Sequence, residues 1–246
     1  MFERLMASIM EAEGRGRMED TDSVAARGDP GLPAATRTRV LAIEGNIGVG
    51  KSTVMDALKR RYANTEGVVF LDEPVDEWRE RGFLDRMYKD PSCKPQFQHM
   101  VLMSLAGNLL KALAAEPRPK FIVMERSPWG NYHVFGRTNL TGDDLEMYKY
   151  TWENVLKGVP AQLDVRYIYL AASNPAHLVP RLRSRARSEE DVVGVDYLTK
   201  LEAAHCDGWL ADEPNKRIVD GLGEADAVLA HVYRHVCEWM NELPVA

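Results

Sequence analysis

The segment Gly45–Ser52 limits the possible folds of this chain more than any other feature. Its sequence, GNIGVGKS, fits the pattern G-x-x-x-x-G-K-[ST], a loop between a strand and a helix that wraps phosphate groups. The β-branched run Val40–Ile43 precedes it and a helical pattern at 51–62 follows. Loop N–H groups bind phosphate oxygens, the lysine bridges terminal phosphates and the serine hydroxyl reaches Mg²⁺. The predicted nucleotide-binding residues are Gly45, Asn46, Ile47, Gly48, Val49, Gly50, Lys51, Ser52 and Thr53.

Short β-branched runs alternate with longer helical patterns from Arg39 onwards. Four of the five runs are almost continuously apolar, which is typical of strands covered on both faces. This alternation predicts one α/β domain with a five-stranded parallel sheet, right-handed crossovers and flanking helices. One helical pattern, 97–115, is apolar nearly all round and is expected to be central. The predicted strands are Val40–Ile43, Val68–Leu71, Phe121–Met124, Val165–Leu170 and Arg217–Val219, and the predicted helices are 51–62, 97–115, 143–157, 195–210 and 224–241.

The composition is that of a globular protein that can bury a large core. Of the 246 residues, 45% are apolar and 28% charged, and the formal net charge of −6 argues against a nucleic-acid-binding domain. No run approaches the roughly 18 apolar residues of a membrane helix. Cys93, Cys206 and Cys237 have no CxxC spacing, which suits a reducing compartment. We therefore expect no nucleic-acid partner, no membrane partner and a cytoplasmic location.

Residues 1–37 differ in composition from the rest of the chain. Acids such as Glu3, Glu11 and Glu19 interrupt this stretch, whereas organelle transit peptides are poor in acids. Residues 14–33 are rich in Gly, Pro, Asp and Arg without apolar periodicity, which is typical of flexible segments. The sequence predicts a flexible tail over 1–37 and a single domain over 38–246.

Phosphate loops also occur in GTP switches, so the loop alone does not define the reaction. A switch normally carries N-K-x-D for guanine, but the only Asn-Lys pair here, Asn215–Lys216, is followed by Arg-Ile. Of the two D-x-x-G stretches, 220–223 lies after that pair, and 191–194 follows the arginine-rich segment instead of a predicted strand. A kinase of a small acceptor, which needs a base for the acceptor hydroxyl and arginines for the phosphoryl group, is the better interpretation.

Carboxylates follow two of the predicted strands. Glu73 comes just after Val68–Leu71, and Glu125-Arg126 comes just after Phe121–Met124. Ligands of open α/β sheets bind at the carboxyl ends of strands, so Glu73 could serve as a general base. Glu125 could hold Mg²⁺ together with Ser52, while Arg126 neutralises the acceptor site. The alternatives are an acid that caps a turn and an ordinary surface Glu–Arg pair.

Four arginines at every second position, 181–187, are followed by a serine and then by acids. On one helix, Arg181 and Arg185 share a face, while Arg183 and Arg187 point roughly the opposite way. A helix that runs into a loop would let two or three of them reach the phosphates as a closing lid. A solvated charged face and a nucleic-acid patch are the alternatives, and the acids at 189–191 count against the patch.

Together these motifs resemble those of the deoxyribonucleoside kinases, which transfer the γ-phosphoryl group of ATP to a nucleoside 5′-hydroxyl. The resemblance runs from about Val40 to Leu210, with the motifs in the family's order. It implies that Glu73 takes the 5′-hydroxyl proton and is held by Arg126, and that Lys51 and the loop bind ATP. It also implies Mg²⁺ at Ser52 and Glu125, and lid roles for Arg181, Arg185 and Arg187 but not Arg183. The matching segments are IEGNIGVGKST, EPVDEW, MYKDP with FQ following, MERS and RLRSRARSEE with a later Tyr-Leu.

The resemblance also implies a nucleoside pocket. Glu190 and Tyr88 would bind the sugar 3′-hydroxyl, and the Gln98 amide would read the base edge, since it offers an acceptor and a donor together. Taken without the family, aromatic residues at these positions are more often part of a core. The residues implied to pack on the base are Trp78, Phe97 and Phe135.

The base preference depends on two further positions. Members that prefer deoxycytidine or purines use an Arg–Asp pair where this chain has Leu105 and Asn131. Without that arginine a thymine methyl group gains room against Val101, which favours thymidine and deoxycytidine. A purine-preferring enzyme, a nucleoside monophosphate kinase and a nucleotide-binding scaffold without turnover are the alternatives.

Two remaining features concern helix packing. The family's usual homodimer would suit the apolar helix 97–115. The spacing from His205 to Trp209 is one residue longer than the family pattern, so the local packing of that helix is expected to differ.

Overall fold

The computed structural model describes residues 37–159 and 163–241, so nearly all of the predicted tail lies outside the described residues. The chain forms an α/β fold around one five-stranded sheet in which every pairing is parallel, in the order β2-β3-β1-β4-β5. This confirms the predicted fold class. Each predicted strand is present, extended by at most two residues at either end. The strands are β1 (Thr38–Gly45), β2 (Val68–Leu71), β3 (Phe121–Glu125), β4 (Leu163–Ala171) and β5 (Lys216–Asp220).

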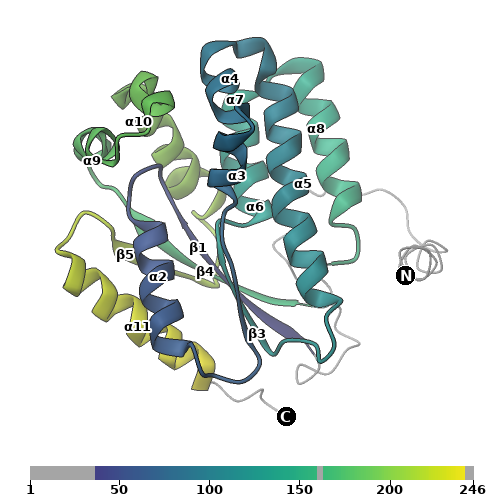
Figure 1. Cartoon of the computed structure of the whole chain (residues 1–246), viewed down its shortest axis with the longest axis vertical. Helices are drawn as coiled ribbons and strands as arrows, with labels where there is room; N and C mark the ends of the chain where they lie inside the picture. Colours follow the sequence, from purple (N-terminus) through teal and green to yellow (C-terminus); the bar gives the residue numbers. More distant parts are fainter. Residues whose placement is uncertain (1–36, 160–162, 242–246) are drawn as a thin grey trace.

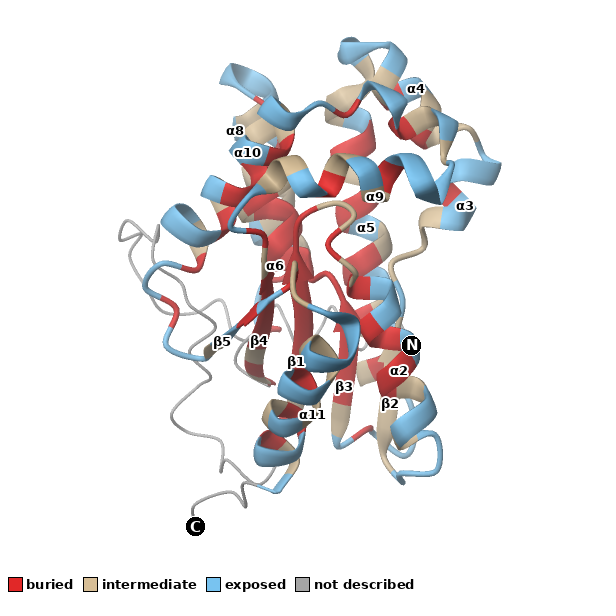
Figure 2. Ribbon diagram, turned by 90° about the vertical axis from the view of Figure 1, so that its left-hand side faces the viewer, coloured by how far each residue is buried: buried red, intermediate tan, exposed pale blue. Residues whose placement is uncertain are grey.

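Helices cover both faces of the sheet (Figure 1). On one face, α2 (Lys51–Tyr62) and α11 (Ala225–Asn241) pack on the β1 side chains Leu41 and Ile43. On the other face, α5 (Lys94–Leu113) packs on Val40 and Ala42, because successive residues of a strand point to opposite faces. In Figure 2 the central strands are mostly buried, whereas the edge strand β5 carries exposed residues.

Helix α5 corrects one expectation, because it is not buried all round. Eight of its side chains are buried, among them Leu102 and Leu109, but Gly107 and Lys111 are exposed and Met103 is 53% exposed. The helix packs against α8 (Gly142–Val155). It therefore lies on one face of the sheet with an open stripe toward solvent.

Several shorter helices were not predicted, since each is too short to show clear periodicity. They lie above the carboxyl ends of the strands, with α3 and α4 on one side and α9 on the other (Figure 1). The unpredicted helices are α3 (Val75–Glu80), α4 (Phe83–Lys89), α6 (Pro128–Gly130), η4 (Asn131–Gly136), α7 (Arg137–Asn139) and α9 (Leu178–Arg185), with short 3₁₀ turns at 91–93, 175–177 and 188–192.

The unusual spacing before Trp209 has a structural explanation. Helix α10 (Val195–Ala203) runs into a π-helical turn, η8 (Ala204–Trp209), in which the N–H of Leu210 donates to the His205 carbonyl at 2.8 Å. A π turn takes up one extra residue without ending the helix. The side chain of Trp209 still stacks on His133 at 5.6 Å. The predicted helix 195–210 is thus present, with its last turn widened.

Among the described residues, none of the helices combines the length and apolar character that crossing a bilayer requires.

Candidate active site

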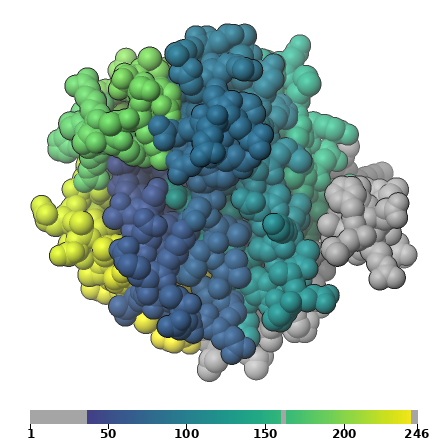
Figure 3. All heavy atoms as spheres, viewed as in Figure 1, coloured from purple at the N-terminus to yellow at the C-terminus, as the bar shows by residue number. Residues whose placement is uncertain are grey.

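The carboxyl ends of β1, β2 and β3 open into a cavity of about 470 Å³. The phosphate loop forms its floor, and α3 and α4 form one wall. The opposite wall is the lid segment, which we define as α9 and the 3₁₀ turn η7, residues 178–192. In Figure 3 the green lid segment lies against the blue α3–α4 segment above the purple α2. Predicted site residues that line the cavity are Ile47, Gly48, Gly50, Lys51, Ser52, Thr53, Glu73, Trp78, Tyr88, Phe97, Gln98, Val101, Glu125, Arg126, Asn131, Phe135, Arg181, Arg185, Arg187 and Glu190.

Four predicted site residues do not line the cavity: Gly45, Asn46, Val49 and Leu105. Gly45 has a φ of 147°, and a β-carbon there would lie 2.8 Å from the Leu170 carbonyl, so the loop requires glycine. Asn46 is fully buried and shapes the loop from behind. Leu105 is 2% exposed and belongs to the apolar cluster behind the pocket, so its expected contact with substrate is not seen.

Asn46 is held by a residue that the sequence did not reveal. Its Nδ2 group donates to the Glu202 carboxylate at 2.9 Å and to the Leu198 carbonyl at 2.8 Å. Glu202 also accepts hydrogen bonds from the Tyr169 hydroxyl and from the Ala172 N–H. Helix α10 is therefore tied directly to the loop. No local signal marks Glu202, because the contact joins residues 156 positions apart.

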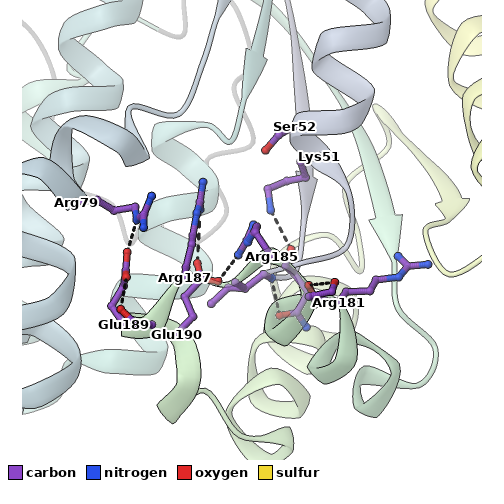
Figure 4. A network of polar contacts seen from close by, with 12 residues as sticks. Lys51, Ser52, Arg79, Arg181, Arg185, Arg187, Glu189 and Glu190 are labelled. Carbon is purple, nitrogen blue, oxygen red and sulfur yellow. Dashed lines mark hydrogen bonds and ion pairs between the residues drawn. The ribbon is translucent and has the colours of Figure 1, made fainter.

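Lys51 begins helix α2 and is buried under the loop. Its Nζ group donates to the carbonyl oxygens of Asn46 at 2.9 Å and Gly45 at 3.1 Å (Figure 4). Burial, followed by the charge of Arg126, lowers the pKa of Lys51 to about 8, against the opposing effect of nearby carboxylates. Bound phosphate groups would favour the charged form of the lysine.

Ser52 and Glu125 form an oxygen pair beside the loop. The serine hydroxyl donates to Glu125 Oε1 at 2.7 Å. Burial and the nearby Glu73 carboxylate raise the pKa of Glu125. Among residues 37–159 and 163–241 there is no cluster of three or more His, Cys, Asp or Glu side chains that could hold a metal. The pair does fit Mg²⁺, which in kinase sites takes one or two protein oxygens and completes its shell with phosphate oxygens and water.

Glu73 and Arg126 lie together, as the sequence predicted. The guanidinium Nε of Arg126 donates to Glu73 Oε1 at 2.9 Å, and their side chains are only 4% and 13% exposed, respectively. Burial lowers the pKa of Arg126, but the Glu73 and Glu44 carboxylates outweigh this effect and raise it. The Arg126 guanidinium carbon also lies 4.1 Å from the centre of the Phe135 ring. Glu125 and Arg126 are both buried, so the alternative of an ordinary surface Glu–Arg pair at 125–126 is wrong.

The lid arginines are separated by a sharp bend. Helix α9 ends at Arg185, and Ala186 adopts a left-handed conformation with φ 53°. Arg185 and Arg187 therefore converge on the buried Glu190, at 2.5 and 3.5 Å (Figure 4). Arg181 donates to the carbonyls of Val49 and Gly221, at 3.2 and 2.9 Å. Arg183 is exposed and does not line the cavity.

A second contact joins the lid segment to the opposite wall. Arg79 of α3 forms an ion pair with Glu189 (Figure 4), and Arg187 lies 3.8 Å from Asp76. Neither contact could be read from the sequence, because α3 was not predicted. In this structure the two walls of the cavity are connected.

The predicted nucleoside pocket combines an apolar wall with unpaired amides. Trp78 meets Phe97 edge-on at 5.9 Å. Gln98 and Asn131 are 2% and 1% exposed, and the Oε1 of Gln98 and both polar atoms of Asn131 have no hydrogen-bond partner. Buried amides without partners are costly, which points to a ligand that supplies them. Tyr197, not predicted, also lines this region.

Comparison with known proteins agrees with this geometry. Residues 41–241 match the model of the deoxynucleoside kinase family. The chain is 30% identical to the thymidine kinase of Ictalurid herpesvirus 1, over 80% of this chain and 86% of that protein. It is 28% identical to a probable deoxycytidine kinase of fowlpox virus (80% and 88%) and 27% identical to mouse deoxycytidine kinase (80% and 85%). The chain belongs to the deoxynucleoside kinase family and is a nucleoside-phosphorylating enzyme.

Proposed function

We propose that this kinase transfers the γ-phosphoryl group of ATP to the 5′-hydroxyl of pyrimidine deoxynucleosides, with thymidine and deoxycytidine as acceptors. The observation that carries the proposal is the buried Gln98 amide in the cavity wall, whose Oε1 has no partner. An amide pairs with O4 and N3–H of thymine or, after a flip, with N3 and the amino group of cytosine. The cluster behind it, which holds Leu105 and Val101, is apolar.

The acceptor chemistry depends on Glu73. Its carboxylate lies at the carboxyl end of β2 in the cavity, where it can take the 5′-hydroxyl proton as the hydroxyl attacks. Arg126 keeps it oriented through a charge-assisted hydrogen bond of 2.9 Å. An acid at this position also disfavours an acceptor that already carries a phosphate, which argues against a monophosphate kinase.

The donor phosphates would lie on the loop and under the lid segment. Lys51 and the loop N–H groups face the β- and γ-phosphates, and Arg185 and Arg187 would exchange Glu190 for the transferring group. Ser52 and Glu125 would hold Mg²⁺, which neutralises charge on the phosphate oxygens. The pairing of both lid arginines with one carboxylate supports this role, because it keeps the two cations together at the cavity.

The test is phosphoryl transfer from Mg-ATP to thymidine, deoxycytidine, deoxyadenosine, deoxyguanosine and dTMP, measured side by side. We expect turnover of thymidine and deoxycytidine. Preference for the purine nucleosides would contradict the base assignment, and turnover of dTMP alone would contradict the role of Glu73.

A homodimer is the proposed assembly. Exposed apolar side chains lie on α5 and α8, two helices that pack against each other: Met103 is 53%, Met147 65% and Tyr150 70% exposed. Light scattering of the wild-type protein should give a mass of two chains, and the Met147→Glu variant should give the mass of one chain. Ile218→Glu on β5, an equally exposed apolar position at 58%, is the control and should leave the dimer intact.

A further inference from the structure

The turn after β3 has an unusual backbone. Arg126 has a φ of 59°, a region that side chains other than glycine rarely adopt. Its two neighbours both contribute to the site or its support: Glu125 binds Ser52, and Ser127 caps the next helix by accepting the Gly130 N–H at 3.0 Å. A turn of this kind persists only where surrounding contacts hold it.

Glu44 supplies such contacts from the neighbouring strand. Ile43 is level with Glu125 in the parallel β1–β3 pair, which places Glu44 beside the turn. Glu44 Oε1 accepts hydrogen bonds from the N–H of Ser127 at 2.8 Å and from its hydroxyl at 2.6 Å. The Arg126 N–H donates to the Ile43 carbonyl at 3.0 Å. The end of β1 therefore forms hydrogen bonds with two successive residues of the turn, Arg126 and Ser127.

The surroundings of Glu44 are shaped around its carboxylate. The residue is 0% exposed, and its Oε2 atom has no hydrogen-bond partner. A β-carbon on Gly130 would lie 2.5 Å from that oxygen, so the chain has glycine where the carboxylate needs room. Burial raises the pKa of Glu44, while the charges of Arg126 and Lys51 oppose the rise. A buried carboxylate is costly to keep, and packing alone does not require one.

From these contacts we infer that Glu44 is a positioning residue for phosphoryl transfer. It immediately precedes the phosphate loop, and through Ser127 it sets the turn that carries both Glu125 and Arg126. Glu125 in turn accepts a hydrogen bond of 2.7 Å from Ser52, and Arg126 donates one of 2.9 Å to Glu73. Glu44 thus fixes the position of Glu125 on the ATP side of the site relative to Arg126 on the nucleoside side, and it does so through the turn and not by binding a substrate. The inference rests on the proposed roles of Glu73 and Arg126.

The experiment compares Glu44→Ala with Glu44→Gln in the full chain, using Mg-ATP and thymidine. Because a small displacement of reacting groups is costly, Glu44→Ala should lower kcat about tenfold or more, with the KM for ATP changed less than about threefold. Glu44→Gln keeps an acceptor oxygen for Ser127 and should recover most of the lost kcat. Glu213→Ala is the matched control, since the Glu213 side chain is buried and accepts from the Asn215 N–H before β5 but does not line the cavity. It should lower Tm and leave kcat unchanged.

A mutant cycle with Ser127→Ala identifies the route of the effect. If Glu44 acts through Ser127, the double variant should lose less kcat than the product of the two single losses, because the hydroxyl bond between the two residues is lost only once. Losses that multiply, an unchanged kcat in folded Glu44→Ala, or a Gln variant as slow as the Ala variant would each overturn the inference.

Two further results need their own interpretation: a Glu44→Ala variant that does not fold, and a wild-type chain that has no nucleoside kinase activity. If Glu44→Ala does not fold, Ser127→Ala alone decides, because it removes the hydroxyl bond and should lower kcat severalfold with little change in the KM for ATP; no change in kcat would overturn the inference. A wild-type chain without nucleoside kinase activity would contradict the proposed function itself, and this result is distinct from any effect of the variants.

Discussion

Arg126 donates to Glu73 across the carboxyl ends of two neighbouring strands, at 2.9 Å and largely shielded from solvent. A carboxylate held in this way is oriented before substrate arrives. The strands β2 and β3 are adjacent and parallel, so their end residues meet at one edge of the sheet. Variants of this pair therefore test the proposed chemistry most directly.

Replacing Glu73 by glutamine should abolish the base while keeping the side-chain shape. We expect kcat to fall by about 10²–10⁴-fold, the usual contribution of general-base catalysis, with ATP affinity preserved. Single-turnover assays and ATP titration would measure the two quantities. Glu77→Gln, an exposed acid of α3 paired with Arg81, should change neither. Near-normal kcat in Glu73→Gln would remove Glu73 from its role.

The lid arginines should differ from their neighbour Arg183. Arg185→Ala and Arg187→Ala each remove a cation from the cavity, and we expect kcat to fall on the order of 100-fold, as with the loss of other donors that stabilise transition-state charge. Arg183→Ala, which changes an exposed residue of the same helix, should be close to wild type. Equal losses in all three variants would show a general effect on α9 instead.

Lys51 predicts a specific pH dependence of stability without ligands. Its pKa is lowered from 10.5 to about 8, so the unfolded chain binds more protons between these values and stability rises with pH across this window. Below pH 8 the charged, buried lysine costs on the order of 3 kcal/mol. The Lys51→Met variant loses this effect, so its free energy of unfolding relative to wild type should decrease between pH 8 and 10.5.

Urea unfolding of both chains at several pH values would measure the difference. The pH dependence of the difference is the informative quantity, because Lys51→Met also removes the bonds to the Gly45 and Asn46 carbonyls. A difference that is constant across the window would contradict the lowered pKa.

The base preference should respond to Leu105 and Asn131 together. The double variant Leu105→Arg, Asn131→Asp rebuilds a charged pair at the base edge, and we expect its preference for deoxycytidine over thymidine to rise by about tenfold or more, since the arginine fills the space of the thymine methyl group. Each single variant would bury an unpaired charge and should be less stable than the double variant. Competition assays and thermal unfolding measure these effects, and an unchanged ratio in a folded double variant would contradict the assignment.

The sequence predicted the sheet and the floor of the site well. The apolar runs of the strands and the Gly45–Ser52 pattern are local signals, so the strands, the loop and α2 lie where expected. The carboxylates at strand ends followed from the parallel sheet. The bend that brings Arg187 back to Glu190 was required by the arginine spacing, although its place at Ala186 was not predictable.

The remaining features depend on contacts between distant residues. Leu105 shares a face of α5 with Val101 but lies one turn further along the helix, where it packs in the cluster with Trp78 and Phe97 and does not line the cavity. The support of Asn46 by Glu202 and the Arg79–Glu189 ion pair have no local pattern. A sequence can place residues at an edge of a sheet, but which of them meet is decided by the tertiary structure.

The widened turn at Ala204–Trp209 also bears on which changes of length this chain can tolerate. A residue inserted into a regular helix would rotate everything after it by about 100°, and the surplus residue in the π turn avoids that rotation. Deleting Asp207 should therefore give a regular α-helical turn, with the segments before and after it in the same positions. The loss of one residue here would change the pitch of a single helical turn and leave the fold as it is.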